Sequence, residues 1–273
     1  MIKFKTRSWA LIRTFITCIF FSCSFTQVMA DENATSQKVD DINSTVDELY
    51  SGLRGRYPQL FRLNSENYKL SRDRCLKQDP LPYWCHVHSQ YFWYGKVVKQ
   101  DYGKAYKYLN IGAKLGYANS QTAIGDLYYF GLGVEKNEKN AFDWWSKAAA
   151  QNNKEAQFKL GVMYEDGNVV SKNYMKAHDL YLKSAEQGYV KAQVNLAASY
   201  KLGLGVKKNY DKAFFWFSKA AEKGNLEAMA SLAFIYGRGE GVPKNERLGL
   251  LWLKKAADAG HEKSKFFLKK IKK

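Results

Sequence analysis

Small and apolar residues recur along this chain with a fixed period of 36 residues. One position of the period holds Ala105, Ala141, Ala177, Ala213 and Gly249, each 36 residues after the one before it. A period between about 20 and 50 residues is the mark of a repeat architecture, in which each unit buries its apolar face against its neighbours. The chain is therefore predicted to be an array of equivalent units.

Each period contains two stretches with the spacing of α-helices. The first carries a small residue, then isoleucine or leucine four residues later, and tyrosine after four more. This stripe fits one face of a helix and is too regular for a strand. The second stretch carries paired aromatic residues followed by paired alanines, as in Trp144-Trp145 and Ala148-Ala149. The stripe of the first stretch consists of Ser120, Ile124 and Tyr128; Ala156, Leu160 and Tyr164; Ala192, Leu196 and Tyr200; and Ala228, Leu232 and Tyr236.

A glycine-rich loop between the two stretches invites comparison with a phosphate-binding loop. In one unit it reads Gly203-Leu204-Gly205-Val206 and is followed by two lysines. A dinucleotide-binding loop needs a strand before it and a helix N-terminus over the phosphate, whereas this loop follows a predicted helix. Its first glycine recurs where a helix C-cap requires a positive φ. We therefore predict a turn between helices, capped by Gly131, Gly167, Gly203 and Gly239.

The repeated residues resemble a known family. The pattern A-x-x-x-L-G-x-x-Y-x-x-G-x-G-V, followed by K-A-x-x-W-[YF]-x-K-A-A-x-x-G, is similar to the Sel1-like repeat, a relative of the tetratricopeptide repeat. It is clearest in residues 192–224 and 228–260 and covers roughly residues 84–270. The resemblance implies an all-α fold, a right-handed α-solenoid of 36-residue helix-turn-helix repeats that mediates protein–protein contacts. It implies no catalytic chemistry.

Four segments are expected along the chain. Residues 1–30 have the basic start, apolar run and small-residue end of a secretory signal peptide, with cleavage before Asp31. Residues 31–48 are polar and acidic, which predicts a disordered tether. Residues 49–83 are expected to cap the first repeat, and residues 84–273 to form the solenoid with a capping helix over 262–272. Export to the periplasm or the outside of a bacterial cell follows; lipid attachment at Cys23 is the alternative.

Two cysteines remain after the predicted cleavage. Cys75 and Cys85 form an even pair in an exported chain, which favours a disulfide. The alternative is a metal site from these cysteines together with His86 and His88, but zinc sites prefer two to four residues between cysteines. We therefore predict a disulfide and neither a metal nor a cofactor. The isolated His178 and His261 are expected at the surface.

Charge and motifs bear on the function class. The chain has 43 Lys and Arg against 26 Asp and Glu; removing residues 1–30 leaves 39 against 26, a net charge of +13. Such a charge favours binding to nucleic acid or to an anionic surface, and export makes nucleic acid the less favoured partner. A solvated lysine-rich face and weak contact with peptidoglycan or anionic lipid both remain open. The serine and zinc-hydrolase motifs are missing, so we predict a protein that is not an enzyme; a hydrolase is the least favoured reading.

The predicted working surface is a groove lined by the first helix of each unit. Residues between the core positions are aromatic towards the N-terminus, acidic in the middle and basic towards the C-terminus, which suits an extended peptide or a protein projection. We expect a monomeric adaptor for envelope assembly or host interaction; the alternative is an immunity protein that neutralises a delivered toxin. Packing of the aromatic residues against the N-terminal segment also stays open. The groove residues are Tyr83, His86, Trp93, Tyr94, Asp126, Tyr129, Phe130, Glu155, Phe158, Glu165, Asp166, Lys201, Phe234 and Arg238.

Overall fold

The computed structural model describes residues 63–76 and 82–271, which contain twelve helices and no strand. The predicted signal peptide, the tether and residues 49–62 of the capping segment lie outside the described residues. The helices are α3 (Ser65–Cys75), α4 (Pro82–Tyr94), α5 (Tyr102–Lys114), α6 (Ala118–Phe130), α7 (Glu138–Ala150), α8 (Lys154–Asp166), α9 (Tyr174–Glu186), α10 (Val190–Leu202), α11 (Tyr210–Glu222), α12 (Leu226–Arg238), α13 (Glu246–Asp258) and α14 (Glu262–Ile271).

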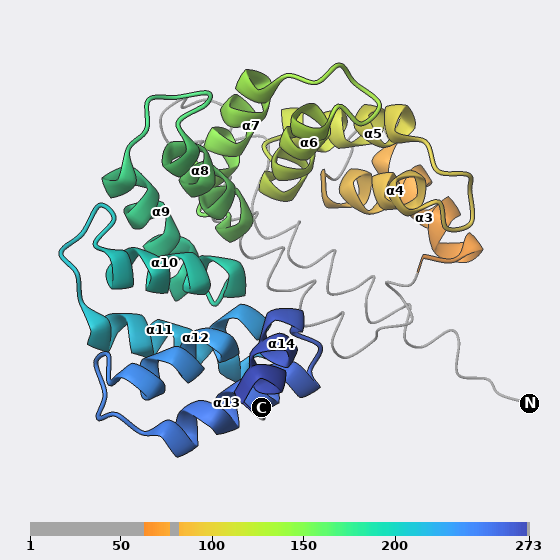
Figure 1. The fold of residues 1–273 in the computed structure, drawn as a ribbon. Coiled ribbons are helices and arrows are strands. Elements are labelled where there is room, and N and C mark those ends of the chain that lie inside the picture. Colours follow the sequence, from red (N-terminus) through yellow and green to blue (C-terminus); the bar gives the residue numbers. More distant parts are fainter. Residues whose placement is uncertain (1–62, 77–81, 272–273) are drawn as a thin grey trace, which may run out of the picture. The chain divides into compact units, whose positions relative to one another are not determined.

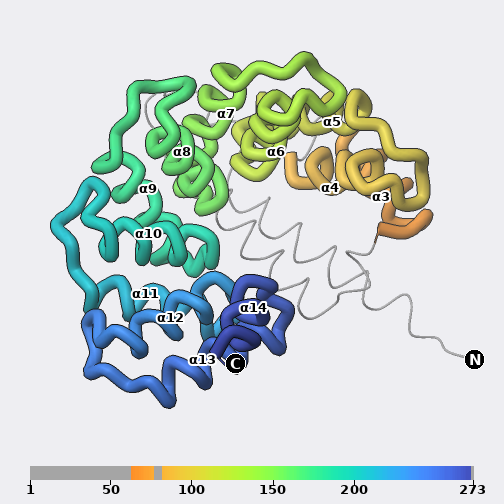
Figure 2. Tube along the Cα trace, in the orientation of Figure 1, coloured from red at the N-terminus to blue at the C-terminus, as the bar shows by residue number. Residues whose placement is uncertain are grey.

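The helices pack in chain order, which confirms the all-α solenoid. The closest packing joins α4 to α5, α6 to α7, α8 to α9, α10 to α11 and α12 to α13, and each pair then contacts the next pair. Figure 1 shows the first helix of each pair on one side of the row and the second helix on the other. The tube in Figure 2 shows the short connections that join successive helices.

A side-chain cap begins the second helix of each pair. The residue before α7, Asn137, accepts a hydrogen bond from the backbone N–H of Asn140 through its side chain, and Asp101, Asn173, Asn209 and Asn245 make the same bond before α5, α9, α11 and α13. Such side chains satisfy donors that the first turn leaves unpaired.

The first glycine of the loop ends a helix, as predicted. Gly131, Gly167, Gly203 and Gly239 follow α6, α8, α10 and α12 with φ of 69°, 77°, 75° and 74°. This left-handed conformation carries no Cβ penalty for glycine. The loop therefore joins two helices, as the turn interpretation requires.

A tyrosine on each of α6, α8, α10 and α12 packs edge-on against a ring on the second helix of the preceding pair. The pairs are Tyr106–Tyr128, Phe142–Tyr164, His178–Tyr200 and Phe214–Tyr236, with interplanar angles of 87°, 78°, 89° and 85°. Edge-to-face contacts of this kind stabilise the packing beyond what the buried area of each ring contributes.

His178 belongs to this series, and our expectation that it lies at the surface is wrong. Its side chain is only 6 % exposed, because it fills the position that Tyr106, Phe142 and Phe214 fill in other units. Burial lowers the pKa of His178. His261 is partly buried between Ser264 and Glu227, with its ring nitrogens 2.7 Å and 3.4 Å from their side-chain oxygens.

Helices α3 and α14 lie at the two ends of the described residues. α3 packs on α4, and α14 packs on α13. α14 buries Ser264 but leaves Phe266, Phe267 and Ile271 exposed. None of the described helices has both the length and the apolar character needed to cross a membrane.

Candidate binding groove

Two cavities lie next to each other over the first helices of the N-terminal units. Together they define the candidate groove. The first cavity, of about 290 Å³, has polar and aromatic walls from α4, α6 and α8. Its lining includes five of the predicted groove residues: His86, Trp93, Tyr94, Asp126 and Glu155.

The second cavity, of about 130 Å³, is smaller and more apolar. It lies between α6, α7 and α8 and the loop that follows α8. Four predicted groove residues line it: Tyr129, Phe130, Phe158 and Asp166. Trp145, Val162, Met163 and Val169 complete its apolar wall. A cavity of this size has room for one aliphatic or aromatic side chain of a partner.

Lys159 joins the two cavities, and sequence reasoning missed it. Its Nζ lies 3.0 Å from Asp126 Oδ1 and 3.2 Å from Glu155 Oε1. Trp145 donates a hydrogen bond of 3.1 Å from Nε1 to the same oxygen of Asp126. The predicted acidic centre of the groove is therefore occupied by an internal cation. The i, i+4 spacing of Glu155 and Lys159 was a visible signal, but nothing along the chain indicated that Asp126 would meet the same ammonium.

Burial and charge act in opposite directions on this cluster. Burial raises the pKa of Asp126 above its usual value, and the negative charge of Glu155 adds a smaller increase, although Lys159 lowers it. For Lys159, burial lowers the pKa, but two carboxylates together raise it above its usual value. Lys159 lies beside two carboxylates, whereas Asp126 lies beside one ammonium group. The raised pKa therefore favours the charged form of Lys159, while the raised pKa of Asp126 disfavours its charged form.

Five of the predicted groove residues line neither cavity: Tyr83, Glu165, Lys201, Phe234 and Arg238. Tyr83 packs edge-on against Trp84 and Tyr117. Glu165 accepts a hydrogen bond of 2.5 Å from the hydroxyl of Tyr181.

The C-terminal part of the predicted groove contains an acid that sequence reasoning missed. Lys201 lies 3.1 Å from Glu240 and Arg238 lies 3.5 Å from it, so its carboxylate partly offsets the predicted basic charge. Glu240 sits in the glycine loop, where the turn pattern indicated no role for its side chain. Phe234 packs against Phe267 with ring centroids 5.7 Å apart.

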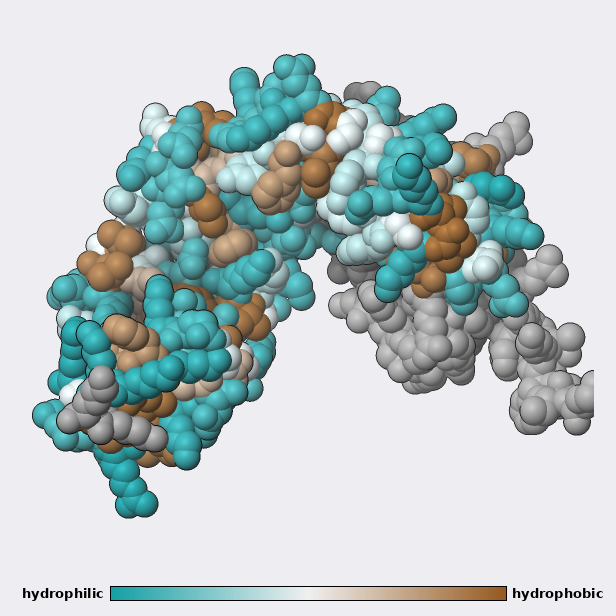
Figure 3. Space-filling model, turned by 45° about the vertical axis from the view of Figure 1, so that its right-hand side comes forward, coloured by the Kyte–Doolittle hydropathy of each residue, from teal (hydrophilic) through white to brown (hydrophobic). Residues whose placement is uncertain are grey.

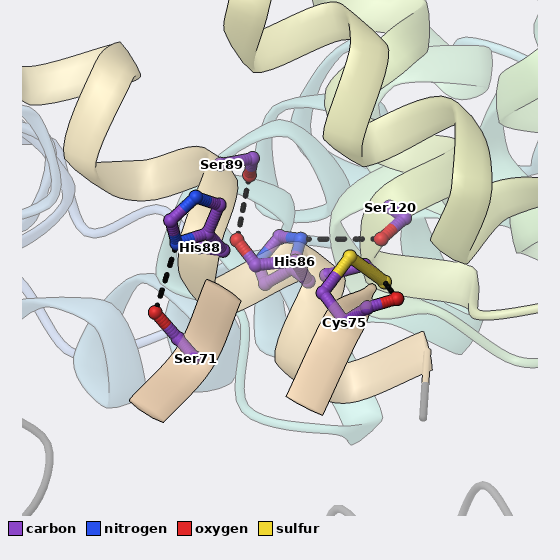
Figure 4. The surroundings of a disulfide bond; sticks show 7 residues. Ser71, Cys75, His86, His88, Ser89 and Ser120 are labelled. Atoms are coloured by element: carbon purple, nitrogen blue, oxygen red, sulfur yellow. Dashed lines mark hydrogen bonds between the residues drawn. A yellow bond between two sulfur atoms is a disulfide. The ribbon is translucent and has the colours of Figure 1, made fainter. Parts of the chain in front are cut away.

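The predicted disulfide joins α3 to α4. Cys75 and Cys85 are bonded, with their Cα atoms 4.6 Å apart (Figure 4). On the chain-entropy model, such a short closed loop stabilises by about 3 kcal/mol. Sulfur atoms in a disulfide are not the thiolates that bind zinc. Within residues 63–76 and 82–271, no group of three or more His, Cys, Asp and Glu residues is placed to hold a metal ion.

The two histidines near the disulfide point to different neighbours. His88 Nδ1 lies 3.0 Å from Ser71 Oγ on α3, and His86 Nδ1 lies 3.4 Å from Ser120 Oγ on α6 (Figure 4). Burial lowers the pKa of both rings to about 4, and the positive charge of Arg72 also lowers that of His88. Both histidines are therefore neutral at pH 7.

The family model of the Sel1 repeat matches residues 86–117, 118–153, 154–189, 190–225 and 226–261. These five units cover well over half of the chain and coincide with the helix pairs described above. The chain belongs to the Sel1 repeat family. Members of this family are helical scaffolds that generally bind other proteins and generally do not catalyse reactions.

Solved structures of this family share the fold. A Sel1 repeat protein from Oxalobacter formigenes is 30% identical, with a TM-score of 0.64 over 71% of this chain and 83% of that one. A protective antigen of uropathogenic Escherichia coli strains is 29% identical, with a TM-score of 0.66 over 86% of this chain. This chain covers 49% of the length of that antigen.

A third structure is that of a protein named as an immunity protein, the alternative function considered above. It is an immunity protein from Pseudomonas aeruginosa, 19% identical, with a TM-score of 0.45 over 72% of this chain and 73% of that one. Similarity at this level carries no argument about the role of the present Sel1 repeat protein. A comparison with curated proteins found no significant match.

Proposed function

We propose that this Sel1 repeat protein is an exported adaptor that binds an extended segment of another protein across α4, α6 and α8. The observation that carries the proposal is the pair of adjacent cavities, which together contain nine of the fourteen predicted groove residues. An apolar side chain of the partner would enter the smaller cavity. Polar groups of the partner would lie in the larger one.

Exposed aromatic side chains support the same surface. Tyr94 and Phe130 end α4 and α6 at equivalent repeat positions and are 59 % and 61 % exposed. Tyr94 lines the larger cavity and Phe130 the smaller one. Aromatic residues at the edge of a pocket are typical energetic centres of protein interfaces. Because Lys159 already pairs with Asp126 and Glu155, we expect the partner to be recognised mainly by shape and apolar contact.

Export rests on the sequence of residues 1–30 and is supported by the disulfide. Disulfides persist in oxidising compartments such as the bacterial periplasm and are rare in the cytosol. Intact-mass measurement of the protein purified from its own cell tests this point. We expect a chain that begins at Asp31 with Cys75 and Cys85 oxidised; a cytoplasmic species that retains Met1 would contradict export.

The groove is tested by affinity capture with two matched variants. Tyr94→Ser/Phe130→Ser removes two exposed aromatic rings from the groove. Met175→Ser/Phe215→Ser removes two exposed apolar side chains from α9 and α11, where Met175 is 65 % and Phe215 is 48 % exposed. Both variants should melt like the wild type, because surface substitutions change stability little.

We expect the groove variant to lose the captured partner at least tenfold and the control variant to keep it. Equal capture by both folded variants rules out the groove as the binding site. The captured protein also separates an envelope or host factor from a toxin, and a toxin would favour the immunity role.

A further inference from the structure

Helix α14, the last of the described helices, carries exposed apolar side chains. Phe266, Phe267 and Ile271 are 55 %, 42 % and 59 % exposed. Ile271 occupies the repeat position of Leu127 and Ile235, which are 0 % and 1 % exposed in complete units. The same position is buried in α6 and α12, which pack on α7 and α13, and exposed in α14. α14 therefore covers the unit before it while presenting a new apolar face.

The same helix is strongly basic. Lys263, Lys265, Lys269 and Lys270 are all exposed, and the one acid of α14, Glu262, is paired with Lys265 at 2.7 Å. Lys270 lies 4.6 Å from the ring centroid of Phe266, so charge and apolar surface adjoin each other. On the adjacent α13, Lys254 and Lys255 are exposed and Asp258 is the nearest exposed acid in sequence. Positive charge dominates this end of the described residues.

Two possible binding partners fit the exposed face of α14 poorly: another repeat helix and a second copy of the chain. Another repeat helix packed in register needs a small residue at the position of Lys269, where earlier units have Gly125, Gly161, Ala197 and Ala233. A second copy of the chain would bring the same set of lysines against itself, and like charges placed together cost free energy. The occupant must accept both apolar contact and positive charge.

We propose that α14 is a docking site for an anionic lipid membrane. A basic amphipathic helix with exposed phenylalanine and isoleucine is suited to lie in the membrane interface, with its rings among the acyl chains and its lysines at the phosphates. Each lysine near an anionic surface strengthens binding by about fivefold, or about 1 kcal/mol. The site is separate from the groove on α4, α6 and α8, so this function does not depend on the proposed adaptor role.

The test is flotation of the exported chain, which begins at Asp31, with lipid vesicles. We expect binding to vesicles containing about one third phosphatidylglycerol, no binding to pure phosphatidylcholine vesicles, and loss of binding at high salt. Lys269→Glu/Lys270→Glu should weaken binding at least thirtyfold. Phe266→Ser/Ile271→Ser should weaken it at least tenfold, because charge alone does not supply the apolar contact.

Two controls keep the proposal falsifiable. Lys207→Glu/Lys208→Glu makes the same charge change at exposed positions in the loop after α10 and should bind vesicles as the wild type does. The groove variant Tyr94→Ser/Phe130→Ser should also bind vesicles normally. If both lysine variants weakened vesicle binding equally, the net charge of the protein would explain the binding, and the proposed site on α14 would be refuted. Unchanged binding of Phe266→Ser/Ile271→Ser, absence of vesicle binding, or capture of an acidic protein by α14 without vesicle binding would also overturn it.

Discussion

Gly125 lies so close to Trp145 that a methyl group at Gly125 would overlap the indole ring. Gly161 has the same relation to Tyr181 in the next unit. At the equivalent positions later in the chain, alanine replaces the glycine and phenylalanine or leucine replaces the larger ring. The size of one side chain on the first helix is thus matched to that of its partner on the second.

Gly125→Ala should therefore destabilise the protein by about 1–3 kcal/mol, as overpacking of a close-packed contact does. Replacing Trp145 by Phe in the same chain should recover part of this loss, which a double-mutant cycle measures by chemical denaturation. Gly237→Ala is the matched control, because a Cβ there meets nothing within 4 Å inside α12. We expect Gly237→Ala to be neutral or to stabilise by up to about 1 kcal/mol. Strictly additive effects of Gly125→Ala and Trp145→Phe would contradict the size matching.

Lys159→Met should destabilise the protein by about 2 kcal/mol, because it leaves the buried carboxylate of Asp126 without its cation. The pKa of Asp126 is raised by burial even with Lys159 present, and it should rise further in the variant. The penalty comes from the ionised carboxylate, so it should be full near pH 7 and fade as the pH falls and Asp126 takes up a proton.

Chemical denaturation of wild type and Lys159→Met, at pH 7 and at acidic pH, measures this loss of stability. Lys139→Met is the control, since the side chain of Lys139 is 79% exposed and 3.8 Å from Asp143. It should change stability by less than about 0.5 kcal/mol. A penalty for Lys159→Met that grows on acidification would show that Asp126 is not its source.

His88 should make the protein sensitive to mild acid. The ring is 0 % exposed and its pKa is lowered from 6.5 to about 4, chiefly by burial. A histidine with a depressed pKa contributes its full stability above about pH 6.5 and loses it as the pH falls towards 4, where the folded state must take up the proton. The loss amounts to about 3 kcal/mol.

Thermal melts of wild type and His88→Phe between pH 7 and 4 test this, since phenylalanine keeps the aromatic contacts with Tyr68, Phe92 and Tyr108. The variant should show the shallower decline. His86 contributes acid sensitivity to both proteins, so the difference between the two curves is the quantity to compare. Parallel curves would exclude His88 as the acid-sensitive group.

The two glycines of one loop should respond differently to alanine. Gly203 and Gly205 have similar φ values of 75° and 69°. A Cβ on Gly203 meets nothing closer than 3.5 Å, whereas a Cβ on Gly205 would overlap the backbone of Tyr174 and Met175 at the start of α9. Gly203→Ala should cost about 1 kcal/mol from backbone conformation alone, and Gly205→Ala clearly more. Equal unfolding midpoints would refute this difference, and saturable ATP binding by calorimetry would revive the phosphate-loop interpretation.

The local parts of the fold could be predicted from the sequence. Helices, turns and caps depend on contacts within a few residues, so a stripe such as Ala192, Leu196 and Tyr200 and a glycine at position 203 indicate where a helix lies and ends. A helix, α14 at Glu262–Ile271, lies where the helix over 262–272 is predicted for the same reason. The Cys75–Cys85 bond was predictable because these two cysteines form an even pair in a chain expected to be exported.

Only the tertiary structure decided which side chains meet across units. Asp126 and Lys159 are 33 residues apart and Lys201 and Glu240 are 39 apart, so the rotation of one helix pair against the next determines these contacts. His178 is buried, although it was expected at the surface, because its ring takes the position of Phe142 and Phe214 between two packed helices. The exposure of Ile271 likewise follows from the helices around it, since the same apolar position is buried in one unit and open in another. The sequence by itself determined the repeating unit and its turns, because those depend on local spacing. The charge pairing of the groove depends on neighbours distant in the chain, and the open face of α14 depends on how the helices pack around it.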